Sequence, residues 1–369
     1  MRIKVLQVYK TFFPETKGGV EHTIHSLSRD LKDYNIECKV LCLTNKKVKS
    51  VDIFDGIEVI RYPQTSNFAS CPTSLSLLLN FKKESEWADI IHFHYPWPFG
   101  DLFSLLASSN KKKLITYHSD IVKQKHIKAL YKPLEQYFLH KADRITATSP
   151  NYLASSNNLK KFKQKVTVIP HGINEKHYQK PDIDKCSQIQ QKYGNNFTLF
   201  VGQLRYYKGL HLLLEAVKDL PTNLLILGKG KEEQKLKELC KKLDLQNVYF
   251  LGQLDDGEKV NYINACYALV LPSHLQSEAY GLSLIEGAMF SKPLLSCKIG
   301  SGTDYINIDS LTGIVAEPNV ESIKKGLALL LSNREMAETM GKNARKRFEK
   351  MFTSDIMSKK MADLIKSLV

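Results

Sequence analysis

Short runs of apolar, β-rich residues recur along the chain, and stretches with helical spacing separate them. The runs are IKVLQVY, ECKVLCLT, DIIHFHY, KLITYH, DRITATS and KVTVIP in the first half, and NFTLFVG, TNLLILG, NVYFLG, YALVLPS and KPLLSC in the second. Apolar positions three to four residues apart predict helices over 20–33, 209–219, 231–243, 257–266, 281–290 and 321–331. Buried strands that alternate with helices are typical of parallel sheets, so the pattern predicts the α/β class.

The number of predicted strands indicates how the chain divides. Eleven runs are many for one open sheet, and the best boundary is the loop Pro170-His171-Gly172, which a polar stretch follows. We therefore expect two doubly wound, Rossmann-like parallel-sheet domains facing a cleft, one over 1–171 and one over 172–350, with ligands at the carboxyl ends of the strands. The segment 351–369 is expected to form an amphipathic helix that packs back on the first domain; the alternative is that it closes the second.

Composition excludes several classes of protein. The 369 residues are 43% hydrophobic and 25% charged, as in an ordinary globular protein, which argues against wholesale disorder. No window approaches the roughly 18 apolar residues of a membrane span. Lys4 interrupts the only apolar run at the N-terminus, which favours a first strand over a signal peptide. The seven scattered cysteines contain no C-x-x-C pair, which argues against a disulfide framework or zinc site and favours the cytoplasm.

The net charge of +15 is uneven along the chain. Residues 1–171 hold 26 Lys/Arg and 15 Asp/Glu, or +11, whereas residues 172–369 hold 27 and 23, or +4. A basic first half fits nucleic acid, an anionic membrane surface or a phosphorylated substrate. The chain has no RNA- or DNA-reading motif and no aromatic platform interleaved with the charge, so we expect no nucleic-acid partner.

The segment SEAYGLSLIEGAMFSKP carries the strongest local chemistry. Glu278 lies in a loop after the strand YALVLPS, Gly281 opens a helix, and Glu286 lies inside that helix. The backbone N–H groups of Gly281, Leu282 and Ser283 would be unpaired at the helix start, where the helix dipole favours an anion. A diphosphate there, with a carboxylate on either side for sugar hydroxyls, makes a sensible nucleotide-sugar site.

This segment resembles the Glu-x7-Glu signature of retaining, GT-B-fold glycosyltransferases of family 4. The resemblance extends along nearly the whole chain, through FFPETKGGVE, TYHSD, ADRITATSP, VIPHGI and VGQLRYYKGL, in the family's order. It implies a retaining hexosyltransferase with a nucleotide-sugar donor. The stretch LIEGAMFSKPLLSCKIGSGTDYIN resembles mannosyltransferases of bacterial O-antigen and related polysaccharides, which implies GDP-mannose as donor and an undecaprenyl-diphosphate-linked glycan as acceptor.

The resemblance also implies roles for residues in the first half. Gly18 and Gly19 would let backbone approach a phosphate or acceptor. His118, at the carboxyl end of KLITY, would lie beside the reacting sugar and contact its hydroxyls through backbone or ring.

In the second half, Lys208 and Arg205 would neutralise the departing diphosphate. The family's arginine after the glycine is Gln203 here, so either Arg205 replaces it or Lys208 carries most of the charge. Glu278 would hold donor-sugar hydroxyls and Glu286 the ribose. With those cations, no metal or other cofactor is expected.

Three further features leave alternatives open. His92 and His94 lie on one face of a strand, but they lack acidic or Cys partners at metal-ligand spacing, so we expect no metal there and an aromatic loop for sugar or lipid stacking after them. The basic clusters 111–113 and 160–165 predict peripheral contact with the cytoplasmic face of an anionic inner membrane. A UDP-sugar-dependent transferase, a nucleotide-sugar epimerase of the same fold and a non-catalytic scaffold subunit remain alternative functions.

Overall fold

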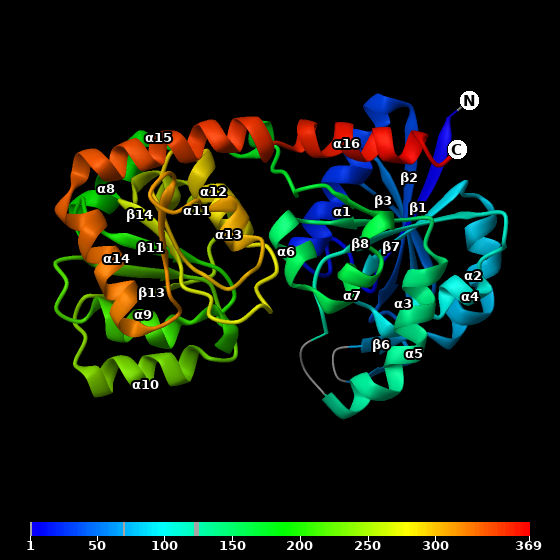
Figure 1. Cartoon of the computed structure of the whole chain (residues 1–369), viewed down its shortest axis with the longest axis horizontal. Coiled ribbons are helices and arrows are strands. Elements are labelled where there is room, and N and C mark those ends of the chain that lie inside the picture. The colour runs from blue at the N-terminus through cyan, green and yellow to red at the C-terminus, as the bar shows by residue number, and fades with distance from the viewer. Residues whose placement is uncertain (1, 69–70, 122–124) are drawn as a thin grey trace. The chain divides into compact units, whose positions relative to one another are not determined.

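The computed structural model describes residues 2–68, 71–121 and 125–369, and it separates the chain into two units. The first contains Met1–Gly172 and Ser354–Val369, and the second contains Ile173–Thr353. Each unit has a sheet with helices on both faces (Figure 1). The chain therefore crosses from one unit to the other twice, next to residue 172 and next to residue 353.

The first unit is built on an eight-stranded sheet in the order β10-β9-β8-β7-β1-β2-β4-β3, parallel except for the edge strand β3. Its strands are β1 (Ile3–Val8), β2 (Ile36–Thr44), β3 (Ser50–Phe54), β4 (Ile57–Pro63), β7 (Ile90–Tyr95), β8 (Lys112–Tyr117), β9 (Arg144–Ala147) and β10 (Val166–Val168), with a separate hairpin of β5 (Ser66–Phe68) and β6 (Cys71–Thr73). Its helices are α1 (Gly19–Asp30), α2 (Leu75–Glu86), α3 (Pro98–Asp101), α4 (Phe103–Leu106), α5 (Lys125–Lys141), α6 (Pro150–Ser155), α7 (Asn157–Lys161) and α16 (Ser354–Lys366). The switch in strand order falls between β1 and β7, where a doubly wound sheet binds ligands.

The C-terminal helix α16 packs on the first unit. Met357, Met361 and Ile365 repeat at helical spacing and lie in one apolar cluster with Leu27 of α1 and Val5 of β1. Burial of these side chains holds the last residues of the chain against the first strand.

The second unit has a wholly parallel six-stranded sheet in the order β13-β12-β11-β14-β15-β16. Its strands are β11 (Thr198–Val201), β12 (Leu224–Leu227), β13 (Val248–Gly252), β14 (Ala268–Leu271), β15 (Leu294–Cys297) and β16 (Gly313–Ala316). Its helices are α8 (Ile183–Tyr193), α9 (Leu210–Val217), α10 (Glu233–Leu243), α11 (Asp256–Ala265), α12 (Leu282–Met289), α13 (Thr303–Ile306), α14 (Val320–Ser332) and α15 (Arg334–Met351). Renumbered from β11, this is the Rossmann order 3-2-1-4-5-6, with its switch point between β11 and β14.

The predicted α/β class with two doubly wound parallel sheets is confirmed. Each of the eleven predicted runs forms a strand, and the six predicted helices correspond to α1, α9, α10, α11, α12 and α14 with ends shifted by a few residues. The pattern missed β3, β4, β16 and the β5–β6 hairpin.

Candidate functional site

The loops that follow β11 and β14 meet at the switch point of the second sheet. Gly209 has a φ of 71°, directly after the 3-10 turn η4 (Tyr206–Lys208). A Cβ at this position would overlap the carbonyl oxygen of Pro272 in the loop after β14, so glycine permits the close approach. The approach lets Lys208 Nζ form an ion pair with Glu278 Oε2.

The ion pair of Lys208 and Glu278 is nearly enclosed, with side chains 12% and 10% exposed. Ser273 Oγ donates to the same carboxylate oxygen at 3.1 Å. Burial alone lowers the pKa of Lys208, but the negative charge of Glu278, helped by Tyr207 and by the hydrogen bond to the carboxylate, raises it above its ordinary value. Lys208 is therefore a fixed cation at the carboxyl end of β11, as neutralisation of a diphosphate requires.

Helix α12 begins beside this pair. Its N-cap, Gly281, has a φ of 94°, and a Cβ there would lie 3.1 Å from side-chain carbons of Leu271 and Thr303. The N–H groups of Leu282 and Ser283, in the first turn of the helix, have no helical carbonyl to reach, and the positive end of the helix dipole is at the same point. The sequence prediction placed an anion here.

Glu286 lies four residues further along α12 than Leu282 and is 7% exposed. Its Oε1 accepts hydrogen bonds from Lys259 Nζ at 2.7 Å and from the Tyr178 hydroxyl at 2.8 Å. Burial lowers the pKa of Lys259, but Glu286 and Asp256 outweigh burial and raise the pKa well above its ordinary value. Two partners therefore orient this carboxylate, and the sequence prediction named neither.

Arg205 has a different environment from Lys208. Its guanidinium nitrogens Nε and Nη2 each donate to Gln203 Oε1 at 3.3 Å, and the side chain is exposed. It lines a cavity of about 250 Å³ together with Tyr206, Lys235 and Leu236, among others. Gln203, the residue that departs from the family pattern, thus holds the nearby arginine by its amide oxygen.

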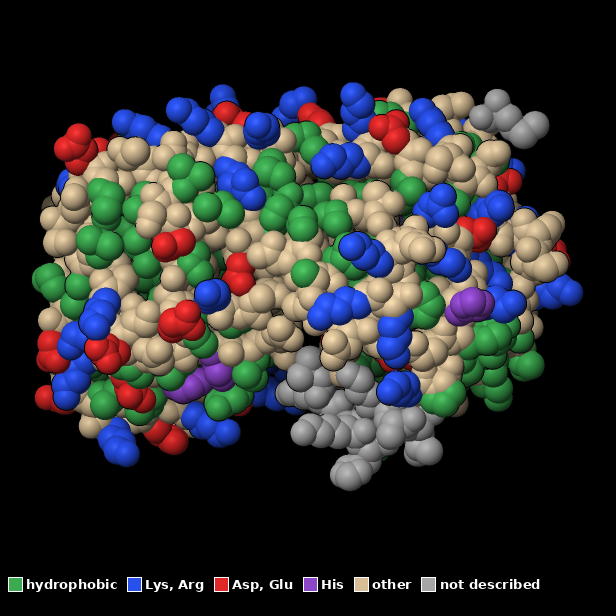
Figure 2. Space-filling model, viewed as in Figure 1, with side chains coloured by type: hydrophobic (Ala, Val, Ile, Leu, Met, Phe, Trp, Pro, Cys, Tyr) green, Lys and Arg blue, Asp and Glu red, His purple; other side chains and the backbone are tan. Residues whose placement is uncertain are grey.

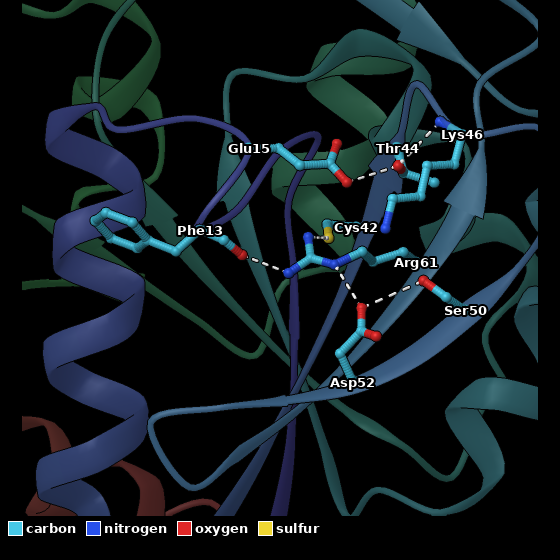
Figure 3. Close-up of polar contacts among 8 residues, drawn as sticks. All are labelled: Phe13, Glu15, Cys42, Thr44, Lys46, Ser50, Asp52 and Arg61. Atoms are coloured by element: carbon cyan, nitrogen blue, oxygen red, sulfur yellow. Dashed lines mark hydrogen bonds and ion pairs between the residues drawn. The ribbon is translucent and has the colours of Figure 1, made fainter.

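The glycine-rich loop of the first unit runs from the end of β1 to α1. Buried Arg61 of β4 donates to the Phe13 carbonyl oxygen in this loop, to Asp52 Oδ2 at 3.1 Å and to Cys42 Sγ at 3.4 Å (Figure 3). Thr44 Oγ1 donates to Glu15 Oε1 at 2.6 Å. The buried Arg61 guanidinium and the Thr44 hydroxyl, both on strands of the sheet, thus hold the loop in place.

Gly18 and Gly19 follow as the N-cap and first residue of α1. A Cβ on Gly18 would lie 2.5 Å from Oε2 of Glu21, whose other oxygen accepts from Thr11 at 2.8 Å and from Thr16 at 2.9 Å. The buried Glu21 carboxylate is therefore fixed against the glycine. The predicted role of the pair in approaching a phosphate or acceptor remains a prediction.

His118 lies one residue beyond β8 and is 7% exposed. Its Nε2 is 2.9 Å from His94 Nδ1, and its Nδ1 is 3.2 Å from His171 Nε2. His92, two residues before His94 on β7, bonds through Nε2 to Thr116 Oγ1 at 2.7 Å. On β7, Nε2 of His92 and both ring nitrogens of His94 therefore bond to protein groups.

Among the residues that the structure describes, no group of three or more His, Cys, Asp or Glu side chains is arranged to hold a metal ion. The described helices also include none that is long and apolar enough to cross a bilayer. The expectation of metal-independent transfer remains a prediction.

The predicted site residues divide between the two units. The second unit brings together Lys208 and Glu278, and it places Leu282, Ser283 and Glu286 on α12 with Gly281 as the N-cap. Gly18, Gly19 and His118 belong to the first unit. The sequence prediction missed Lys259, Tyr178 and Ser273. The contacts of Tyr178 and Lys259 with Glu286 span 108 and 27 residues, so no local spacing signals them. Ser273 is only five residues from Glu278, and a serine near a strand end is too common to single it out.

Two family models match the chain. The model for Glycosyltransferase Family 4 matches residues 17–177, and the model for Glycosyl transferases group 1 matches residues 182–347. The first match includes Gly18, Gly19 and His118, and the second covers the segment with Lys208, Glu278 and Glu286.

Similar proteins include two bacterial transferases. An O-antigen chain mannosyltransferase of Escherichia coli is 41% identical over 368 residues, which is 100% of this chain and 99% of that protein. A D-rhamnosyltransferase of Pseudomonas aeruginosa is 41% identical over 353 residues, 95% of this chain and 93% of that protein.

Solved structures share the fold at lower identity. Sucrose-phosphate synthase from Thermosynechococcus elongatus has a TM-score of 0.84 at 22% identity, covering 100% of this chain and 99% of that one. The Anabaena protein HepE in complex with UDP and glucose has a TM-score of 0.80 at 17% identity, covering 100% of both chains. The GT-B class expected from the sequence is confirmed.

Proposed function

The chain belongs to the family 4 glycosyltransferases, and we propose that it transfers mannose from GDP-mannose to a lipid-linked glycan in the synthesis of a bacterial surface polysaccharide such as O-antigen. The enclosed ion pair of Lys208 and Glu278 beside the N-terminus of α12 carries the proposal. The pair supplies a fixed cation and a carboxylate, and the first turn of α12 adds backbone N–H groups that have no helical acceptor. A nucleoside diphosphate sugar needs this combination of groups.

Binding of the donor would rearrange this pair. The diphosphate competes with Glu278 for Lys208, since both are anions, and its arrival releases a carboxylate oxygen to accept from sugar hydroxyls. Glu286, held by Lys259 and Tyr178, accepts from the ribose hydroxyls. Each group then binds a different part of the donor: Lys208 the diphosphate, Glu278 the sugar and Glu286 the ribose.

The proposed reaction retains the anomeric configuration. The acceptor hydroxyl oxygen bonds to the anomeric carbon on the face from which the diphosphate departs, the bond from that carbon to the phosphate oxygen breaks, and the hydroxyl proton passes to the leaving phosphate. No side chain then needs to act as a covalent nucleophile. The enzyme mainly stabilises the charge on the leaving group, through Lys208, the start of α12 and, to a smaller extent, Arg205.

Two sugars are candidates for the group transferred, mannose and D-rhamnose. One relative is a mannosyltransferase and the other a D-rhamnosyltransferase, at the same 41% identity. D-Rhamnose is 6-deoxymannose, so the two sugars share ring configuration and differ only in the C6 hydroxyl. We propose mannose, and D-rhamnose is the second candidate.

A donor screen tests the proposal. Thermal unfolding with GDP, UDP and ADP should show a shift with GDP, because a ligand that binds only the native state stabilises it. Turnover is then compared for GDP-mannose and GDP-D-rhamnose with a lipid-linked glycan acceptor, and the product's anomeric configuration is read by NMR. Faster turnover of GDP-D-rhamnose would show that D-rhamnose, not mannose, is the sugar transferred. A thermal shift only with UDP would show that the donor nucleotide is UDP. A product of inverted configuration would exclude a retaining reaction.

The acceptor proposal concerns the first unit and the cytoplasmic membrane face. Two lysines of the predicted basic clusters bond to the protein itself. Lys111 Nζ donates to the carbonyl oxygens of Glu86 and Ala88, near the end of α2, at 2.9 and 2.6 Å. Lys165 Nζ likewise donates to those of His140 and Ala142, at the end of α5, at 2.6 and 2.9 Å. These two lysines therefore cap helices, and their ammonium groups are less free to reach acidic lipids than the sequence implies.

A better candidate is a surface that we name the β3–α2 face. Its members are exposed apolar and lysine side chains: Val48, Val51, Ile53, Leu75, Leu79, Lys46, Lys47, Lys49, Lys82 and Lys83. Ile53 is 71% and Leu79 77% exposed, and a groove of about 300 Å³ joins Lys49 to Asn80 and Lys83 of α2. Hydrophobic side chains lie among Lys and Arg over α2 and α4 (Figure 2).

We assign this face to the anionic bilayer that holds the acceptor. Apolar side chains enter the interface, and each nearby lysine except Lys49 adds about 1 kcal/mol of attraction to acidic lipids. Lys49 Nζ is paired with Glu84 Oε1 at 2.7 Å. The protein should sediment with phosphatidylglycerol vesicles and not with phosphatidylcholine vesicles, and salt should release it. The double variant Lys82→Glu, Lys83→Glu should lose binding, whereas Lys241→Glu, on exposed α10, should not. Unchanged vesicle binding in the double variant would overturn the assignment. So would a wild-type dimer that the double substitution converts to a monomer, because the face would then be a contact between two copies of the chain.

A further inference from the structure

A continuous chain of buried side chains runs through the carboxyl ends of the strands in the first unit. Gln7 Oε1 of β1 lies 2.8 Å from His94 Nε2 of β7, and His94 Nδ1 lies 2.9 Å from His118 Nε2 after β8. His118 Nδ1 lies 3.2 Å from His171 Nε2 in the loop after β10. All four side chains are at most 7% exposed. We call Gln7, His94, His118 and His171 the imidazole relay.

The relay has a direction, which its first member sets. The Gln7 amide nitrogen donates to Cys38 Sγ at 3.7 Å, so the amide oxygen faces His94. Burial raises the pKa of Cys38 to about 12, so Cys38 remains a thiol. An oxygen acceptor at Gln7 requires a proton on His94 Nε2, since a neutral imidazole has one N–H and one acceptor nitrogen.

The same logic passes along the chain. With its proton on Nε2, His94 accepts through Nδ1, so His118 must donate from Nε2. His118 then accepts through Nδ1, and His171 donates from Nε2. Hydrogen bonds in such a chain polarise one another, so the three tautomers are coupled.

We propose that Gln7, His94 and His171 are positioning residues that hold His118 in one neutral tautomer, with its proton on Nε2. Both ring nitrogens of His118 are then engaged by the protein. This proposal rests on the proposed function, because it concerns the histidine that the family places beside the donor sugar.

The surroundings of the relay favour neutral rings. The centroid of the His94 ring lies 4.4 Å from that of His92 and 6.2 Å from that of Tyr9, whose ring is nearly perpendicular to it. Burial, followed by the neighbouring histidines, lowers the pKa of His94 and His118 well below the ordinary value, and burial lowers the pKa of His171 to about 4.

A charged group acts on Tyr9, whose ring packs against His94. Glu21 raises the pKa of Tyr9, secondarily to burial, and it also acts on Lys10. Among the described residues, His94 bonds to Gln7 and His118, and His118 bonds to His94 and His171, so the ring nitrogens of these two histidines face an amide oxygen and other imidazoles.

The first experiment reads the tautomers directly in the full chain. Histidine is labelled with ¹⁵N, long-range proton–nitrogen spectra are recorded near pH 7, and signals are assigned with single His→Gln variants. We expect neutral rings with the proton on Nε2 for His94, His118 and His171. A proton on Nδ1, or an imidazolium, at any of the three would overturn the proposal. The measurement needs no turnover, so it stands apart from any failure of the proposed function.

The second experiment changes the charge at the end of the relay. Gln7→Glu is nearly isosteric, accepts through both oxygens and favours an imidazolium at His94. We expect imidazolium signals near pH 7, and GDP-mannose turnover that falls about tenfold per pH unit on acidification while wild type stays flat. Gln164→Glu, at an exposed site of the first unit, is the matched control and should leave both readouts unchanged. Altered tautomers with a wild-type pH profile would overturn the positioning role; if the variant fails to fold, the wild-type spectra decide.

Discussion

Acid should destabilise the first unit through four buried imidazoles, those of His92, His94, His118 and His171. Burial lowers the pKa of each, to about 3 for His92 and about 4 for His171. In the unfolded chain the pKa of histidine is about 6.5. As the pH falls from there toward 4, the unfolded chain binds protons that the native unit does not, so the free energy of unfolding decreases.

The size of the effect follows from these values. Between pH 6 and pH 5, an imidazole that stays neutral in the native state and titrates at about 6.5 when unfolded lowers the free energy of unfolding by about 1.2 kcal/mol. Four such groups together lower it by roughly 5 kcal/mol. A domain is stable by about 5–15 kcal/mol, so the first unit loses a large share of its stability within one pH unit.

Tryptophan fluorescence isolates this unit. Both tryptophans of the chain, Trp87 and Trp97, lie in it, so urea unfolding followed by their emission reports the first unit alone. The variant His92→Gln should lose about 1.2 kcal/mol less than wild type between pH 6 and pH 5. His140→Gln is the matched control, because His140 is an exposed histidine on α5 of the same unit.

The comparison uses the difference between variants, so carboxylates that titrate in the same range cancel. Equal pH dependence for wild type and His92→Gln would refute a neutral, buried His92. A change in His140→Gln as large as that in His92→Gln would show that burial is not the cause.

Three further outcomes are expected. Lys208→Met should lower transfer by about 100-fold or more, and Arg205→Gln by about tenfold or less, because Lys208 is enclosed and paired with a carboxylate whereas Arg205 is exposed. Steady-state rates measure the losses, and circular dichroism checks that both variants are folded. Similar losses in the two variants would contradict this reasoning. Lys259→Met should destabilise the second unit by about 3 kcal/mol in calorimetry, since Glu286 stays buried without its cation, and Lys259→Arg should restore most of the loss. EDTA should leave transfer unchanged; a clear loss that Mg²⁺ or Mn²⁺ restores would show that the reaction uses a metal.

The predictable part of the fold is the part in which burial is continuous. Strands covered on both faces, such as β11 and β14, read as unbroken apolar runs. Strand β4 escaped notice because Glu58 and Arg61 interrupt its apolar residues. Arg61 is tolerated inside because Asp52, on the neighbouring β3, pairs with it and the Phe13 carbonyl oxygen accepts from it. That compensation is tertiary and leaves no local pattern.

The same division holds for the candidate site. Local motifs predicted Glu278, Gly281 and Glu286, because a strand end, a glycine and a helix start follow one another in the sequence. Their partners could not be predicted: Lys208 reaches Glu278 only because two loops pack closely, and Lys259 meets Glu286 only because α11 lies beside α12. Whether a carboxylate is paired depends on packing, which the spacing of residues does not record.

The placement of α16 has a consequence for synthesis on the ribosome. Domains commonly fold in the order in which they emerge, N-terminal first. Here the apolar surface of Val5, Leu27 and Leu31 remains uncovered until Met357 and Ile365 leave the exit tunnel, after the entire second unit. The unit that begins the chain is therefore completed last, and loss of the final turns of the protein exposes the core of its first strand and helix.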